Sequence, residues 1–448
     1  MTVVTPVVDD GLGNSSWIVD LGDGRLAVVD PGRHPGPFLA EAERRGARVA
    51  FSIETHLHAD FVTGSRELAR FGAEVVASAA AGVDWASREL AGGETIDLGG
   101  LTLRALATPG HTPEHLAYLV ADGDNPVGVF TGGSLLVGAV ARTDLISPEA
   151  TEPLARSMWR SLQDLLALPD ATPVYPTHGA GSFCSAPATD RRSTTIGDER
   201  RSNPLLAAPD EDAFVKALLS SVGSYPPYFL HLRDVNRSGP AVLGVPQPPL
   251  PILDLDAVLA AVEAGAVLVD TRPVVAWAAG HIPEALADPL RPQFGSWLGW
   301  LVERHRPIVF VVGADQDRAE LVRQCHQIGY DNLAGELAGG MTAWNAAGRP
   351  VARGRLVDAA EVSGRVLDVR QDSEYDAGHL PGASHVELGR LRLANGEWAG
   401  VDAVMCGHGE RAATAASLLE QAGHAPVAVV VGGPDDWAAH TGRPLTTG

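Results

Sequence analysis

The chain has 448 residues, of which 45% are hydrophobic and 20% charged, so it has the composition of a globular protein of about three domains. Its 55 acidic residues outnumber its 34 basic ones, and the net charge of −21 disfavours nucleic acid and anionic membrane surfaces as partners, because both need clustered Lys and Arg. We see no signal peptide and no run near the roughly 18 apolar residues of a membrane span, and the three cysteines form no CxxC motif, so we expect a cytoplasmic protein.

The first block, residues 1–235, places histidines directly after short apolar runs. Residues 49–53 are typical of a buried strand and precede Thr55-His56-Leu57-His58-Ala59-Asp60. Residues two apart at a strand end point the same way, so His56 and His58 can face one ion. His111 and His178 also follow β-like runs and have Gly or Pro beside them. The block therefore offers four candidate metal ligands.

A proline-rich segment, 236–251, is predicted to be an interdomain linker, because prolines stiffen a chain and remove hydrogen-bond donors. After it the sequence repeats: Val267-Leu268-Val269-Asp270-Thr271-Arg272 returns as Arg365-Val366-Leu367-Asp368-Val369-Arg370. The two units, 252–350 and 355–448, each alternate strand and helix signals. That alternation predicts an α/β domain with a parallel sheet in each unit.

The second unit places a cysteine where a predicted strand ends and a helix begins, in Cys406-Gly407-His408-Gly409-Glu410-Arg411. In such a loop the backbone N–H groups and the helix N-terminus favour a thiolate, and Arg411 adds a positive charge. In the first unit Gly313 stands opposite Cys406, so that unit lacks the nucleophile.

This second unit resembles the rhodanese family of sulfurtransferases in Asp368-Val369-Arg370, in Gly378-His379-Leu380-Pro381-Gly382-Ala383 and in the six-residue cysteine loop. The first unit resembles a rhodanese with an inactivated loop. The resemblance implies that Cys406 carries a sulfane sulfur and that Arg411 helps to hold the anion. It also implies that the substrate contacts the loop residues Gly407, His408, Gly409 and Glu410.

The histidine block resembles the metallo-β-lactamase fold, especially its persulfide dioxygenase and glyoxalase II branch. The resemblance is carried by 55–60, Thr108-Pro109-Gly110-His111, Ala141-Arg142-Thr143-Asp144-Leu145 and Thr177-His178-Gly179. It implies an αββα sandwich with a metal at the sheet edge. The implied metal ligands are His56, His58, His111 and His178, with Asp60 as a catalytic residue and Arg142 as a substrate contact.

Two positions depart from the pattern of that family. Phe61 replaces a histidine that serves a second metal, and Gly133 replaces an aspartate that completes a two-histidine, one-carboxylate iron site in the dioxygenases and bridges two ions in the hydrolases. We therefore expect one divalent metal, zinc or Fe(II). Asp144 is a candidate replacement for the missing carboxylate.

Together these resemblances predict an enzyme of sulfane-sulfur metabolism, in which a persulfide dioxygenase-like metal domain is coupled to a cysteine-persulfide sulfurtransferase domain. One alternative is a glyoxalase II-like thioester hydrolase. Another is a non-catalytic protein that binds or senses sulfur and has a decayed metal site. The expected partner is a small thiol, persulfide or thioester, and a homo-oligomer remains open.

Overall fold

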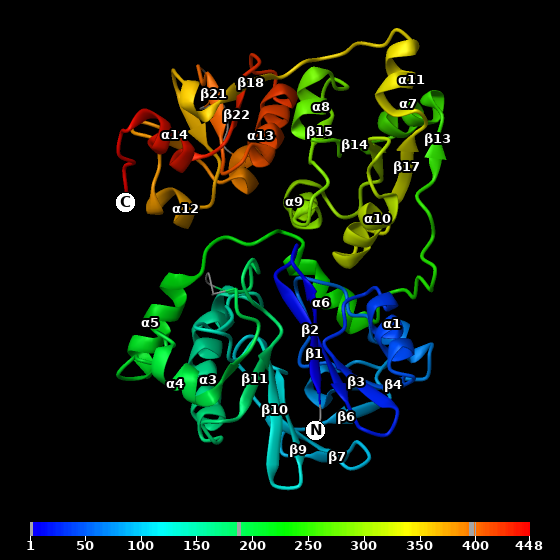
Figure 1. Ribbon diagram of the computed structural model, residues 1–448, viewed down its shortest axis with the longest axis vertical. Helices are drawn as coiled ribbons and strands as arrows, with labels where there is room; N and C mark the ends of the chain where they lie inside the picture. The colour runs from blue at the N-terminus through cyan, green and yellow to red at the C-terminus, as the bar shows by residue number, and fades with distance from the viewer. Residues whose placement is uncertain (1–2, 186–189, 394–397, 399) are drawn as a thin grey trace. The chain divides into compact units, whose positions relative to one another are not determined.

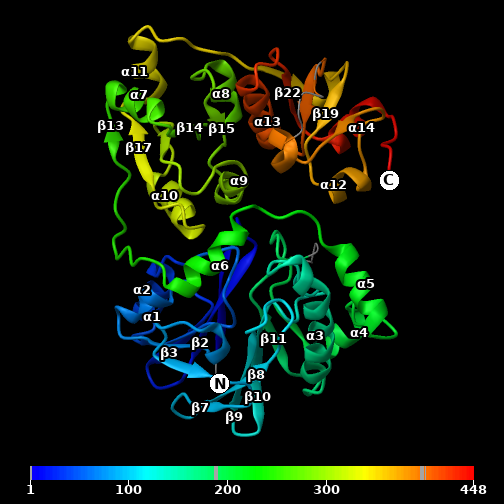
Figure 2. The ribbon, with the colours of Figure 1, turned by 180° about the vertical axis from the view of Figure 1, so that it is seen from behind.

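The computed structural model describes residues 3–185, 190–393, 398 and 400–448. The chain forms two compact units, one reaching to Pro248 and including His326–Gly329, the other built from the remaining residues after Pro248. The elements of both can be followed by colour and label in Figures 1 and 2.

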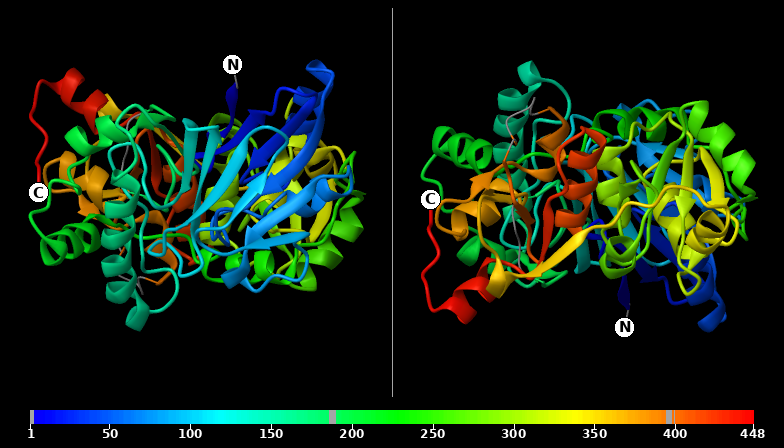
Figure 3. Two further views of the ribbon diagram at one scale, coloured as in Figure 1. Left: turned by 90° about the horizontal axis from the view of Figure 1, so that it is seen from below. Right: turned by 90° about the horizontal axis from the view of Figure 1, so that it is seen from above.

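The first unit contains two six-stranded sheets (Figure 3). In sheet order, the first comprises β1 (Val4–Asp9), β2 (Asn14–Asp20), β3 (Arg25–Val29), β4 (Arg48–Ile53), β5 (Glu74–Ser78) and β6 (Arg88–Leu90). The second comprises β12 (Thr194–Thr195), β11 (Pro173–Pro176), β10 (Asn125–Gly132), β9 (Leu116–Asp122), β8 (Thr102–Ala107) and β7 (Thr95–Asp97).

Helices cover the outer face of each sheet, so the unit is the αββα sandwich that the sequence predicted. The two inner faces share one core, in which Trp17 and Val29 of the first sheet pack with Tyr118 and Phe130 of the second. The covering elements are α1 (Gly36–Arg44), α2 (Ser65–Ala69) and η1 (Ala79–Ala81) with the first sheet, α3 (Pro148–Leu166), α4 (Ile196–Ser202) and α5 (Glu211–Ser221) with the second, and α6 (Phe229–Ser238) after them.

Helix α3 illustrates how the sequence specifies these layers. The Ser147 side chain caps its first turn by accepting the N–H of Ala150. Leu154, Met158 and Leu162 follow at helical spacing and are buried against the second sheet. The outer layer is therefore held by an apolar stripe on an otherwise polar helix.

The second unit contains two five-stranded sheets in which every strand pair is parallel. The first has the order β13 (Ile252–Leu253), β17 (Leu333–Leu337), β16 (Ile308–Val311), β14 (Val267–Asp270), β15 (Leu286–Ala287), with helices α7 (Leu255–Glu263), α8 (Val274–Ala279), α9 (Phe294–Leu301), α10 (Arg318–Gln327) and α11 (Gly340–Ala346). The second has the order β18 (Arg355–Asp358), β22 (Ala428–Val431), β21 (Ala403–Met405), β19 (Val366–Asp368), β20 (Ser384–His385), with α12 (Asp372–Ala377), α13 (Glu410–Gln421), α14 (Pro434–Thr441), η2 (Ala359–Glu361) and η3 (Leu388–Leu393).

The strand order is the same in both sheets, which confirms the two parallel α/β domains predicted from the internal repeat. The exact residue limits of the domains stay a prediction, and α6 runs past residue 235 to Ser238. Within the described part of the chain, no helix has both the length and the apolarity that a membrane span requires.

Candidate metal centre and cysteine loop

Two strand ends and one turn deliver the predicted histidines to one place. His56 and His58 follow β4, His178 follows β11, and His111 lies between β8 and β9. All four side chains are buried. The ring centroid of His56 lies 4.1 Å from that of His58, 4.8 Å from that of His111 and 5.5 Å from that of His178. The structure therefore brings all four rings together.

His56, His111 and His178 form a group suited to one cation. One ring nitrogen from each lies within 4.8 Å of the others. In each ring the Nε2 atom is buried and has no hydrogen-bond partner in the described part of the chain. Leaving buried polar atoms unpaired is costly, so three such nitrogens in one place indicate a missing ligand. Three imidazole lone pairs fit a divalent metal ion.

Buried oxygen atoms hold the other ring nitrogen, Nδ1, of these histidines. His111 Nδ1 donates to the backbone oxygen of Arg142 at 2.7 Å. His178 Nδ1 donates to Asn14 Oδ1 at 3.1 Å. Because Nδ1 carries the proton in both rings, Nε2 presents a lone pair. Such partners fix the tautomer and orientation of metal-binding histidines.

Asp30, which sequence reasoning missed, fixes the third ring. It follows β3 and its carboxylate accepts the Thr55 N–H and the Thr55 hydroxyl, both at 2.7 Å, and the Thr177 hydroxyl. Because the Thr55 proton goes to Asp30, Thr55 Oγ1 accepts the proton of His56 Nδ1 at 2.8 Å. The only signal in the sequence was an aspartate at the end of an apolar run. Its partners lie far along the chain.

His58 faces carboxylates. Its Nε2 lies 3.2 Å from Asp30 Oδ1 and 3.4 Å from Glu54 Oε2. Burial opposes a charge on this ring, but Asp30 and Glu54 outweigh it and raise the pKa of His58 to about 10. The ring stacks on Phe61 with centroids 4.2 Å apart. The predicted ligand His58 thus lies within the cluster beside acidic groups, and neither of its ring nitrogens has a hydrogen-bond partner in the described part of the chain.

Asp60 lies beside the centre as a buried carboxylate. Its Oδ2 accepts the Asn14 side-chain amide at 2.8 Å and lies 3.2 Å from His178 Nδ1. Its Oδ1 has no hydrogen-bond partner among the described residues. Burial opposes its ionisation, but His178 and His58 lower the pKa of Asp60, so it is ionised. It therefore lies beside His58 and His178 as an ionised carboxylate.

The space that a side chain at position 133 would use is filled by His111 and Ala141. The Gly133 N–H donates to His115 Nε2 at 3.0 Å, so His115 Nδ1 carries the proton and donates to Thr108 Oγ1 at 2.8 Å. A Cβ at Gly133 would lie 2.5 Å from Cδ2 of His111. The glycine therefore lets the His111 ring pack against the backbone. His115 is fully paired by these two contacts.

Arg142, predicted to contact substrate, has its guanidinium engaged within the protein. It donates to both carboxylate oxygens of Asp144, at 2.7 and 2.8 Å, and to the backbone oxygens of Phe183 and Gly223. It also lies 4.3 Å from the ring centroid of Tyr225. Its backbone oxygen orients His111, as described above. Asp144, the candidate replacement carboxylate, is committed to this pair.

Cys406 lies where the sequence placed it, between β21 and α13. The Gly409 N–H points at the sulfur, with N to Sγ at 3.1 Å. Gly409 has φ 117°, a backbone conformation that favours glycine. The thiol is buried, whereas His408 is exposed and Gly407 and Glu410 are partly buried. The loop therefore aims a backbone donor at the sulfur and exposes part of its rim.

Arg411 lies in the first turn of α13 and makes a two-pronged ion pair with Glu374, at 2.6 and 2.8 Å. Burial opposes the charge on Arg411, but Glu374 and the nearby Cys406 raise its pKa. The guanidinium carbon lies 5.8 Å from the ring centroid of Trp297, which belongs to the preceding domain. Glu374 and Trp297 are thus the neighbours that position Arg411.

In the corresponding loop of the preceding domain, the side chains of Gln316 and Arg318 form hydrogen bonds with backbone groups of Gly313. The Gly313 N–H donates to Gln316 Oε1 at 2.7 Å, and Gln316 Nε2 donates to the Thr271 backbone oxygen at 2.6 Å. Arg318 donates to the Gly313 backbone oxygen at 2.6 Å and pairs with Glu336 at 3.1 Å. This loop therefore holds neither a thiol nor an open backbone donor at Gly313.

Both parts of the chain match known families. Residues 8–178 match the metallo-beta-lactamase superfamily, and residues 254–347 and 354–440 each match the rhodanese-like domain. A crystal structure of a metallo-beta-lactamase from Staphylococcus aureus subsp. aureus COL is similar, with TM-score 0.66 and 25% identity, over 75% of this chain and 98% of that one.

Two relatives carry different activities in their names. A hydroxyacylglutathione hydrolase from Methylococcus capsulatus is 36% identical over 180 residues, which are 39% of this chain and 64% of that protein. The mitochondrial persulfide dioxygenase ETHE1 of Homo sapiens is 31% identical over 195 residues, which are 43% of this chain and 70% of that protein. The chain spans slightly less than two thirds of the length of the first of these relatives.

Proposed function

Because the chain belongs to the metallo-beta-lactamase superfamily and carries two rhodanese-like domains, we propose that it is an enzyme of sulfane-sulfur metabolism. Its first domain would use one divalent metal to act on a small persulfide, in the manner of a persulfide dioxygenase. Its last domain would transfer a sulfane sulfur through Cys406. Its free cysteines support a reducing, cytoplasmic compartment.

The observation that carries the proposal is the contact between the Gly409 N–H and Cys406 Sγ. A backbone donor aimed at sulfur, together with the N-terminus of α13, favours an anionic sulfur at this position. It favours the thiolate before transfer and the terminal sulfur of a persulfide after it. The pair of Arg411 with Glu374 fixes the guanidinium near the same loop.

Sulfur transfer at Cys406 needs only a donor persulfide and an acceptor, with no oxidant or reductant. The Cys406 thiolate attacks the outer sulfur of a donor persulfide, the S–S bond of the donor breaks, and the donor thiolate leaves. A small acceptor thiolate or cyanide then attacks the outer sulfur on Cys406, and the Cys406 thiolate is regenerated. Gly409 holds the negative charge through its N–H in both half-reactions.

For the metal centre, His56, His111 and His178 would hold zinc or Fe(II) through their unpartnered Nε2 atoms. Bound there, the ion would act as a Lewis acid and lower the pKa of a coordinated water. Asp60 would accept a proton at its unpartnered Oδ1. Asp30, through Thr55, and Asn14 would keep two of the rings in the required tautomer.

A second candidate for the first domain is a thioester hydrolase of the glyoxalase II kind. The observation that favours it is the ligand set, which consists of histidines and has glycine at position 133. Three histidines with an open position are typical of catalytic zinc, whereas Fe(II) oxygenases use two histidines and a carboxylate. A sulfur-binding or sensing protein without turnover is the remaining alternative.

Metal analysis of the full chain, purified without chelator, tests the metal centre. We expect about one zinc or iron per chain, and loss of that metal in the triple variant His56→Ala, His111→Ala, His178→Ala. His385→Ala, which removes a histidine of the last domain, should leave the metal content unchanged. Metal-free wild-type protein would contradict both metalloenzyme functions and favour the sensing alternative.

Two substrates then separate the metal reactions. Oxygen uptake with glutathione persulfide supports the dioxygenase, and hydrolysis of a hydroxyacylglutathione thioester supports the hydrolase. The triple histidine variant should lose whichever activity is present. A metal-loaded chain that turns over neither substrate would contradict both assignments for the first domain.

A further inference from the structure

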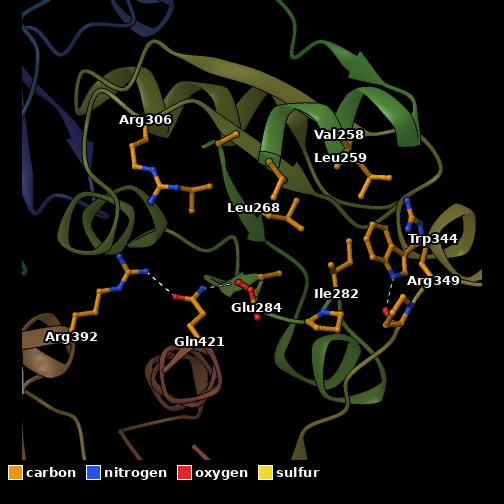
Figure 4. Close-up of a pocket in the computed structure, with 16 residues that line it drawn as sticks. Val258, Leu259, Leu268, Ile282, Glu284, Arg306, Trp344, Arg349, Arg392 and Gln421 are labelled. Atoms are coloured by element: carbon orange, nitrogen blue, oxygen red, sulfur yellow. Dashed lines mark hydrogen bonds between the residues drawn. The ribbon is translucent and has the colours of Figure 1, made fainter. Parts of the chain in front are cut away.

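A cavity of about 640 Å³ lies in the second unit, at the junction of its two rhodanese-like domains (Figure 4). The preceding rhodanese-like domain (252–350) supplies most of the wall, from α7, the start of β14, residues 282–285 and the segment after α11. The last domain supplies Arg392 of η3 and Gln421 of α13. The volume is that of a small-molecule site, and its lining includes neither the Cys406 loop nor its Gly313 counterpart.

One part of the cavity is apolar. Val258, Ile282 and Trp344 are among the core residues that line it, with Leu268 beside them. The Trp344 indole nitrogen donates to the Pro350 backbone oxygen at 2.8 Å, so its polar atom is satisfied. This wall therefore offers carbon surface to an apolar group, which would gain free energy by leaving water.

The other part carries two guanidinium groups from different domains. Figure 4 shows Arg306 and Arg392 on the side of the cavity away from Trp344. Arg306 donates to the Gly265 backbone oxygen at 2.7 and 3.0 Å. Arg392 donates to the Leu301 backbone oxygen at 2.7 Å and to Gln421 Oε1 at 3.2 Å. All of these partners are neutral.

No carboxylate in the described part of the chain forms an ion pair with Arg306 or Arg392. Burial and the charge of Arg306 lower the pKa of Arg392, while Glu303 raises it, so the two guanidinium groups repel each other. An anion between them would relieve this repulsion, and guanidinium groups bind carboxylates and phosphates in a defined, forked geometry.

We propose that this cavity binds an amphipathic organic anion, whose carboxylate or phosphate head lies between Arg306 and Arg392 and whose apolar body lies on Leu268, Ile282 and Trp344. The head group satisfies the two cations, and the body covers the apolar wall. The site is separate from the metal centre and from Cys406. It therefore adds a ligand to the proposed function and does not depend on it.

Isothermal titration calorimetry on the full chain tests the proposal with three probes of equal chain length, all below their micelle-forming concentration. The probes are dodecanoate, dodecyl phosphate and dodecyltrimethylammonium. We expect the anions to bind with a dissociation constant on the order of micromolar, and the cation at least about tenfold more weakly. The ratio between the two anions tells a carboxylate ligand from a phosphate ligand.

Variants then locate the site. Arg306→Gln combined with Arg392→Gln should weaken anion binding at least about tenfold, because charge-assisted hydrogen bonds are lost. The control Arg353→Gln removes an exposed arginine outside the cavity and should bind like the wild type. Leu268→Trp should block the apolar part and weaken all probes, while a thermal melt confirms folding.

Three outcomes would overturn the proposal: no binding of either anion at about millimolar concentration, equal binding of the cationic probe, or unchanged binding by the double arginine variant. Metal content and thiosulfate-to-cyanide transfer, measured on the same variants, should stay at wild-type values. The failure of this proposal is thus distinguishable from failure of the proposed function.

Discussion

The two rhodanese-like domains have the same sheet but different loops. Both sheets have the same strand order. In both domains an Asp–Arg ion pair lies at the end of the second strand in the chain, β14 or β19. Arg272 pairs with Asp270 at 2.5 Å and Arg370 pairs with Asp368 at 2.7 Å. Each arginine also donates to a backbone oxygen eight residues on, that of Gly280 or Gly378. The framework is therefore conserved between the domains independently of the nucleophile.

The difference that bears on sulfur transfer lies in one loop and its charge pairs. In the last domain the Gly409 N–H points at Cys406 Sγ, whereas in the preceding domain Gln316, at the position of Gly409, donates its backbone N–H to the Gly313 backbone oxygen at 3.3 Å. Two domains with one fold thus differ in whether a backbone donor is left for a ligand. The chemistry therefore resides in the loop, because the sheet that presents it is the same.

The largest expected effect is the loss of sulfur transfer in Cys406→Ala. The thiolate is the group that forms and breaks the S–S bond, so we expect thiosulfate-to-cyanide transfer to fall by about a thousandfold or more. Cys325→Ala is the matched control, because Cys325 is buried in the preceding domain and burial raises the pKa of its thiol. Transfer that survives in Cys406→Ala would erase the distinction between the two domains.

The next effect comes from the ion pairs. Glu374→Gln releases Arg411 from its two-pronged pair, and we expect transfer to fall by about tenfold, because the guanidinium is no longer fixed near the sulfur. Glu336→Gln makes the same change in the preceding domain, where Arg318 is released, and should leave transfer unchanged. Equal losses in both variants would indicate a general effect on folding, which a comparison of KM and kcat would reveal.

Much of this arrangement could be predicted from the sequence, because its signals are local. The internal repeat predicted two domains with one topology, and the run from Cys406 to Arg411 predicted a strand, a tight loop and a helix. The four histidines occur in motifs whose order predicted one cluster. Asp30 was missed because its role depends on Thr177, which lies far along the chain.

The contacts of long side chains could not be predicted from the sequence either. Arg142 stays a predicted substrate contact, but the sequence did not predict that its guanidinium pairs with Asp144 or that its backbone oxygen orients His111. Nothing in the sequence predicted that Gln316 Oε1 accepts the Gly313 backbone N–H. Which atom a polar side chain contacts is decided by tertiary packing, and hydrophobic patterning does not record it.

A smaller effect concerns the pH dependence of stability. Burial opposes ionisation of Glu374, but Arg411 outweighs it and lowers the pKa of Glu374 in the folded state. The ionised carboxylate therefore stabilises the last domain above the unfolded glutamate pKa of about 4.3, and this contribution is lost as the pH falls through the lower folded value. Because its side chain is 40% exposed, the contribution is about 1 kcal/mol or less.

The measurement is the melting temperature of wild type and Glu374→Gln by calorimetry across this range. At pH 7 the variant should melt a few degrees lower, and the gap should narrow progressively as the pH falls below about 4.3. Glu336→Gln gives the matching curve for the preceding domain. A gap that stays constant with pH would show that the carboxylate charge is not its cause.

The smallest effect is expected from adding a thiol to the preceding domain, which should restore almost no sulfur transfer. In a Cys406→Ala background, Gly313→Cys restores a cysteine to the preceding domain, but we expect recovered transfer below about one per cent of wild type. A Cβ at Gly313 meets Gln316 Oε1 at 3.3 Å and Asp315 Oδ1 at 3.2 Å, and the Gly313 N–H already has its acceptor. The new sulfur would face an amide oxygen and a carboxylate, and both disfavour a thiolate. Thiol labelling of the folded chain shows that the cysteine is present. If transfer nevertheless returned, the loop geometry would be less decisive than the presence of sulfur, and the two domains would differ by one residue alone.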